Sequence, residues 1–100
     1  MSSTTYDSQK VRLTAQQLRE AYKDVSEEAR PQVKTLRAEI DDAMQGETAE
    51  ALDARLCRLE CDIRRCADAL DTLSARLTRF ADEIDRADSR VSAALTGVAR

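Results

Sequence analysis

The stretch that decides the fold is LDARLCRLECDIRRCADALDTLSARLTRFADEIDRADSRV, residues 52–91. Apolar residues recur in it at every seventh position, and they form two series that are offset by three or four residues. The first series is Leu56, Ile63, Leu70, Leu77, Ile84 and Val91. The second series is Leu52, Leu59, Cys66, Leu73, Phe80 and Ala87. Such a and d heptad positions stay against a partner through left-handed supercoiling, so we predict a long helix, about 48–97, that packs on other helices.

The first half of the chain predicts another helix, about 8–44. Its apolar side chains are separated by three or four positions, as one helical face requires. They are Val11, Ala15, Leu18, Tyr22, Val25, Ala29, Val33, Leu36, Ile40 and Met44. Pro31 removes a backbone hydrogen bond and clashes with the preceding turn, so we expect a kink near residues 27–31. The alternative is that Ser26 caps a fresh helix at this point.

The segment Met44-Gln45-Gly46 is the predicted turn between the two helices. Gly46 is the only glycine before residue 97, and glycine readily takes the left-handed conformation that ends a helix. A short connection of this kind makes the two helices antiparallel. The expected fold class is therefore all-α, an antiparallel two-helix hairpin with its turn at Gly46, in a single domain of residues 1–100.

Composition and charge limit the class of protein. Aromatic residues make up 3% of the chain, with two glycines and one proline, which is typical of long helices rather than sheets. The net charge is −3 with both signs interspersed, so we expect no nucleic-acid partner. No apolar run approaches the roughly twenty residues of a membrane span, and residues 1–10 lack the apolar core of a cleavable signal peptide. We expect no membrane insertion, and a cytoplasmic protein that is secreted, if at all, without such a peptide.

The residues that usually carry chemistry are scarce. The chain has no histidine, no glycine-rich loop and no nucleophile beside a base, so we expect neither an enzyme nor a cofactor. Cys57 and Cys61 share one helical face, but a closed zinc site needs four ligands, so no metal is expected. Cys66 occupies a heptad core position and is predicted to be a small buried residue. The clustered cysteines favour a reducing compartment, although an intermolecular disulfide through Cys57 or Cys61 after export stays open.

Two helices can bury only one stripe each, so we expect a four-helix bundle. It would be a homodimer, or a heterodimer with a related hairpin or with a helical segment of a larger protein. The predicted partner-binding residues, some of which must serve the contact within the chain, are Leu18, Val25, Leu36, Ile40, Leu56, Leu59, Ile63, Leu70, Leu73, Leu77, Phe80 and Ile84. On the flanks, Glu60 with Arg64 and Asp82 with Arg86 have the spacing of ion pairs within one helix.

The turn and the start of the second helix resemble the WXG family, the hundred-residue helical hairpins that type VII secretion systems export. This family, which includes the early-secreted-antigen proteins, has a central Trp-x-Gly turn followed by a helix that opens like G-x-x-A-x-x-L/F. Here residues 44–52 read MQGETAEAL, so Gly46 matches and Met44 stands where tryptophan would. An ordinary helix–turn–helix connection with glycine at the helix end is the alternative interpretation.

The same family carries a Tyr-x-x-x-Asp/Glu export signal at the end of its second helix. This sequence has no tyrosine there, and the segment in a similar place is Ile84-Asp85-Arg86-Ala87-Asp88. Either Asp88 supplies the acidic element with Ile84 replacing the aromatic residue, or Phe80 supplies the aromatic residue with altered spacing to Asp85. A subunit that lacks an intact signal resembles the adaptor of a pair, like the small helical partners of LXG-type toxins, rather than a self-sufficient substrate.

Two functional hypotheses follow. In the first, the chain is an adaptor or co-secreted partner that binds the helices of an export substrate, such as the N-terminal helical domain of a larger secreted toxin. The pair would then present a composite signal to the secretion ATPase. In the second, the chain is a homodimeric structural coiled coil used as a scaffold or tether, with no role in secretion.

Overall fold

The computed structural model describes residues 7–98, and the side chains of residues 7–97. Its elements are α1 (Ser8–Asp24), a π-helical turn (Val25–Ala29), α2 (Arg30–Ala43) and α3 (Glu47–Val98). No strand occurs among these residues, so the prediction of an all-α fold is confirmed. Most of the polar N-terminal segment considered for a signal peptide, residues 1–6, lies outside the described residues.

Helix α1 begins at a side-chain cap. The Asp7 carboxylate accepts hydrogen bonds from the backbone N–H groups of Gln9, at 3.0 Å, and Lys10, at 3.2 Å. These N–H groups have no acceptor within the helix, and a negative charge is favoured at the positive end of the helix dipole. The cap explains why the helix starts directly after Asp7.

The π-helical turn lies at the proline. The Arg30 N–H donates to the carbonyl of Val25, five residues back, and Pro31 follows in the first turn of α2. This wider turn carries the first helical stretch past the proline without a break. The alternative in which Ser26 caps a fresh helix is wrong, because no side chain caps either the turn or α2. A π turn contains one residue more than an α-helical turn, so it changes which of the following side chains face α3. Beyond this turn Arg37 lies toward α3, whereas Leu36 is exposed.

The chain reverses direction between α2 and α3. Met44 leaves the helix in an extended conformation, and its N–H still donates to the Ile40 carbonyl. Gly46 has φ +101°, a value that side-chain-bearing residues rarely adopt. A Cβ atom added there would meet nothing within 4 Å, so glycine is needed for the backbone angle and not for space.

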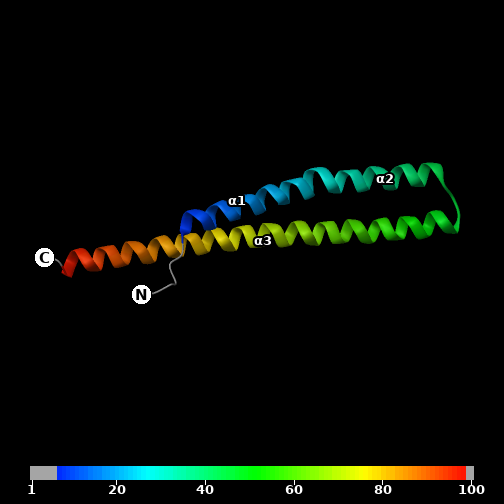
Figure 1. The fold of residues 1–100 in the computed structure, drawn as a ribbon. Coiled ribbons are helices and arrows are strands. Elements are labelled where there is room, and N and C mark those ends of the chain that lie inside the picture. Colours follow the sequence, from blue (N-terminus) through cyan, green and yellow to red (C-terminus); the bar gives the residue numbers. More distant parts are fainter. Residues whose placement is uncertain (1–6, 99–100) are drawn as a thin grey trace.

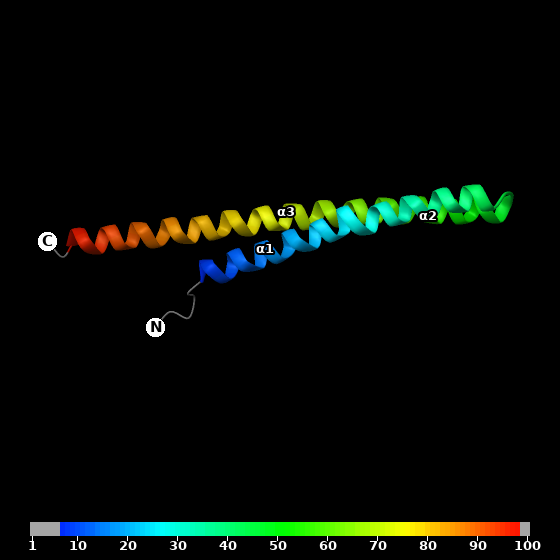
Figure 2. The same cartoon turned by 90° about the horizontal axis from the view of Figure 1, so that it is seen from above.

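The first arm, which comprises α1, the π-helical turn and α2, lies alongside α3 and runs in the opposite direction (Figures 1 and 2). Ion pairs join Arg12 to Asp82 and Arg37 to Asp53, and the two members of each pair lie at similar distances in sequence from Gly46. The molecule measures 81 × 20 × 16 Å. Its α3 helix is the longer element, and its C-terminal end projects beyond the start of α1 (Figure 1).

The contact between the first arm and α3 is built mainly from small residues. Ala81 is fully buried, and Ala15, Ala67 and Ser74 are nearly so. The Ser74 hydroxyl donates a hydrogen bond of 2.9 Å to the Ala15 carbonyl, which two helices can form only when their backbones approach closely. No large side chain is fully buried in the described part of the chain. The two helices therefore lie close together, but the contact between them buries few large side chains.

We predict that Ala81→Leu lowers the free energy of unfolding by about 1–3 kcal/mol, because the added atoms have no space between the helices. Chemical denaturation followed by circular dichroism measures this change. The matched control is Ala54→Leu at an exposed position of the same helix, which should leave stability nearly unchanged. Equal effects of the two substitutions would show that the Ala81 contact is not tightly packed.

Candidate helix-packing surface

The two apolar series of α3 have different environments. Leu56 is buried, and Ile63, Leu70, Leu77 and Ile84 are partly buried against the first arm. Beside this series a second row of residues at seven-residue spacing also faces the first arm, formed by Glu60, Ala67, Ser74 and Ala81. The first arm thus covers the first series together with a neighbouring row of mostly small residues.

The other apolar series is exposed from Leu59 onward, whereas its first member, Leu52, is half-buried. Leu59, Cys66, Leu73 and Phe80, here called the exposed stripe, lie along α3 with 44% of Leu59, 47% of Leu73 and 37% of Phe80 accessible to solvent. The prediction that Cys66 is buried is wrong. Cys66 is exposed because the first arm lies on the other side of the Leu56 series, where Ala67, Ser74 and Ala81 let the helices approach more closely. Where α3 projects past α1, Val91 and Leu95 are also exposed.

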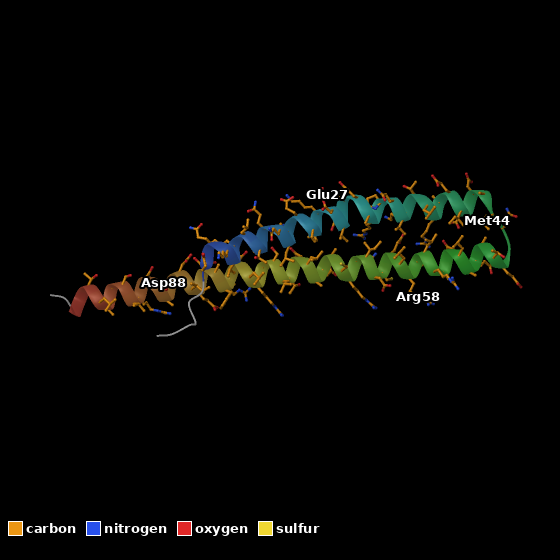
Figure 3. All side chains as sticks on the ribbon, viewed as in Figure 1. Glu27, Met44, Arg58 and Asp88 are labelled. Carbon is orange, nitrogen blue, oxygen red and sulfur yellow. The ribbon has the colours of Figure 1, made fainter. Side chains whose placement is uncertain are left out.

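The predicted partner-binding residues of the first arm are less uniform. Leu18, Val25 and Ile40 are half-buried, whereas Leu36 is exposed. The turn residues Met44, Gln45 and Gly46 are exposed at the end of the molecule where the chain reverses (Figure 3 labels Met44). The structure therefore divides the predicted set into residues that hold the first arm to α3 and residues that remain accessible.

The predicted export-signal residues lie around the point where α1 begins. Phe80, Asp85 and Asp88 are exposed, and Ile84 is half-buried. The Asp85 carboxylate accepts a hydrogen bond of 2.6 Å from Arg12, whereas Asp88 forms no ion pair with the described residues. Figure 3 shows Asp88 at the beginning of the projecting part of α3. Of the two predicted acidic elements, Asp88 is the more accessible.

Arginines of the first arm pair with acids of α3. Arg37 donates to Asp53 at 3.0 Å and to Glu60 at 3.2 Å, and Arg19 pairs with Asp71. The predicted Glu60–Arg64 and Asp82–Arg86 pairs are wrong, because Glu60 binds Arg37 and Asp82 binds Arg12. An acid that can reach an arginine across the interface ties the two helices together. Sequence spacing within one helix cannot predict these pairs, because their members lie on different helices.

Two carboxyl groups at this interface have perturbed acidity. Hydrogen bonds from Arg37 hold the pKa of Asp53 below its usual range. Hydrogen bonds from the Ser8 hydroxyl and then from Arg12 lower the pKa of Asp85 in the same way. The hydrogen bond to Asp53 raises the pKa of the Arg37 guanidinium group, and the hydrogen bonds to Asp85 and Asp82 raise that of Arg12.

Neither a metal site nor a membrane span is visible in residues 7–98. Cys57, Cys61 and Cys66 are free and exposed, and no group of three metal-binding side chains comes together among these residues. No helix that the structure describes is both long and apolar enough to cross a bilayer.

Comparison of the chain with family models, with curated proteins and with solved structures finds no match.

The lowered pKa values predict that stability falls in acid. A carboxyl with a folded pKa below its unfolded value, about 3.9 for aspartate, stabilises the fold above that value, and this contribution is lost as the pH falls through the folded pKa. We expect the melting temperature to be nearly constant from about pH 7 to pH 5 and to decrease below about pH 4.

The variant Asp53→Asn should lower the melting temperature at neutral pH, and its melting temperature should decrease less than that of the wild type below about pH 4. The control is Asp62→Asn, because Asp62 is exposed and forms no ion pair with the described residues. Thermal melts between pH 7 and pH 2.5 make the comparison. If both variants follow the wild-type curve, the Arg37–Asp53 pair contributes nothing to the acid dependence.

Proposed function

We propose that this protein is a small helical packing partner of a type VII secretion system. In this role the chain is an antiparallel two-helix hairpin that completes a four-helix bundle with helices of an export substrate. It acts as an adaptor, or as a co-secreted partner, and covers apolar helical surface until export. The observation that carries the proposal is the exposed stripe, which offers apolar side chains at heptad spacing along α3.

The accessible surface supports packing on a partner. The chain exposes 7958 Å², whereas a compact monomer of 11.2 kDa exposes about 5,700 Å². The excess of roughly 2,300 Å² comfortably exceeds the roughly 800 Å² that each partner buries in a standard interface. Because residues 7–97 include no completely buried large side chain, such an interface would add most of the apolar burial.

The secretion assignment draws on the resemblance to the WXG family. The positive φ of Gly46 gives a physical reason for glycine in the turn segment MQG, with Met44 in the place of the family's tryptophan. Phe80, Ile84 and Asp88 lie together near the start of the projecting part of α3 and would supply this subunit's share of a composite signal for the secretion ATPase. The placement of Asp88 outside the ion-pair network suits that role.

The second candidate is a homodimeric scaffold or tether without a role in secretion, and the same exposed stripe favours it. Export separates the two candidates. In a cell with an active type VII system, an adaptor should appear outside the cell together with its substrate, and deletion of the secretion ATPase should retain both. A scaffold should stay inside in both strains.

We predict that Leu73→Asp abolishes association with the partner and changes the melting curve of the chain little. Leu73 is half exposed in the single chain, but a charge placed there would be buried without a partner in a complex, at a cost of several kcal/mol. Light scattering of the chain, alone and after co-expression with the products of adjacent genes, measures the association. Unchanged native masses in Leu73→Asp would overturn the assignment of the exposed stripe as the packing surface.

A further inference from the structure

The charges of α3 are divided between its two sides. The side that meets the first arm carries the acids that pair with arginines of that arm, namely Asp53, Glu60, Asp71, Asp82 and Asp85. The other side, next to the exposed stripe, is rich in arginine. This arginine flank consists of Arg55, Arg58, Arg65, Arg76, Arg79, Arg86 and Arg90, and its acids are Asp62 and Glu83.

The position of the arginine flank follows from helix geometry. At 3.6 residues per turn, residues seven apart lie in one row, and Arg58, Arg65, Arg79 and Arg86 form such a row with Thr72 in its centre. Figure 3 shows Arg58 on the side of α3 that points away from the first arm. All seven arginines of the flank are exposed, and none forms an ion pair within the described part of the chain.

The interface inside the chain shows how such a charged flank is used. There an apolar and small-residue seam is bordered by arginines of one helix and acids of the other, with the Arg37–Asp53 pair as an example. The exposed stripe is also an apolar seam bordered by charged residues, but here α3 carries the arginines and not the acids. A helix that packs on this stripe would complete the pattern if acids bordered its own apolar seam.

A second copy of α3 meets this requirement only in part. In a two-fold antiparallel pairing centred on the exposed stripe, near residue 69, Arg55 would lie level with Glu83 and Asp62 level with Arg76. The row Arg58, Arg65, Arg79 and Arg86 contains no acid, so there Arg58 would lie level with Arg79, and a pairing centred near Thr72 would set Arg58 level with Arg86. A parallel two-fold pairing would set each arginine level with its own copy. Like charges at such positions oppose pairing.

The first arm of a second copy does not fit this requirement. Its exposed side carries acids such as Glu20 and Glu27, but its exposed large apolar residues before the turn, Leu13 and Leu36, lie far apart in sequence. Two separated residues do not make a seam. A helix of a different chain with acids along its apolar seam would match the whole arginine flank, which neither α3 nor the first arm of a second copy does.

We infer that the exposed stripe of α3 selects a partner helix whose apolar seam is flanked by aspartate and glutamate, and that it prefers such a helix to α3 of a second copy. This inference rests on the proposed function only in taking the partner to be a helix. It adds the chemistry of that helix, which the secretion hypothesis does not specify.

Three synthetic helices of five heptads test the charge rule with the full-length chain. All have the same length: the acidic helix has leucine at a and d and glutamate at e and g, the basic helix has lysine at e and g, and the polar control keeps the glutamates but has serine at a and d. Repulsion between like charges at e and g keeps the leucine peptides from pairing with themselves. Fluorescence anisotropy of each labelled peptide measures binding at low and high salt.

We expect the acidic helix to bind at least about tenfold more tightly than the basic helix, and the difference to shrink as salt screens the charges. The polar control should not bind. Equal affinity for the acidic and basic helices overturns the charge rule and leaves helix packing intact, whereas binding of neither overturns the proposed packing role as well. Binding of the polar control would show a surface that captures polyanions and not an amphipathic helix.

Charge reversal separates the arginine flank from the rest of the chain. The triple variant Arg58→Glu, Arg65→Glu and Arg79→Glu should reverse the preference, so that the basic helix binds more tightly than the acidic one. The control is Arg64→Glu, which lies on the opposite side of α3 and should leave the preference unchanged. Circular dichroism confirms that each variant is folded, and an unchanged preference in the folded triple variant overturns the inference. A wild-type homodimer that persists in light scattering when the acidic helix is present in excess also overturns it.

Discussion

The hydrogen bond from the Ser74 hydroxyl to the Ala15 carbonyl marks the constraint on which the rest of the structure depends. Small residues one heptad to either side, Ala67 and Ala81, are buried in the same row. Only at such a row can two helical backbones approach closely enough for this bond. The first arm therefore lies over the small-residue row and the adjoining Leu56 series, and the exposed stripe is left on the other side of that series.

Electrostatics reinforces this choice of side and sets the register along the helices. Arginines near both ends of the first arm, Arg12 and Arg37, reach acids of α3 that lie at matching distances from Gly46. A slip by one turn would separate these partners. The acids of α3 that face the first arm are thereby paired within the chain, while the arginines on its other side remain exposed. One helix therefore presents an acidic inner side and a mainly basic outer side.

The sequence predicted the helical elements and the glycine turn better than it predicted the packing. Heptad spacing is a local signal, and it reports apolar faces without saying which neighbour covers them. The burial of Cys66 was predicted on the assumption that both heptad series share one seam, and the Glu60–Arg64 pair was predicted without the competing Arg37. The row that forms the true contact, Glu60, Ala67, Ser74 and Ala81, also has seven-residue spacing in the sequence, as does the row of arginines. The large apolar residues, however, give the stronger periodic signal.

Residue spacing and helix propensity act over a few residues, so the sequence is sufficient to predict an all-helical chain with a glycine turn near its middle. The side of α3 that the first arm covers is visible only in the folded chain, because a broad apolar face permits more than one packing direction. Close approach at Ser74 and the ion pairs of Arg12 and Arg37 stabilise the packing on this side of α3. What remains exposed, the stripe through Leu59 and Leu73 with its arginine flank, is the consequence of that packing.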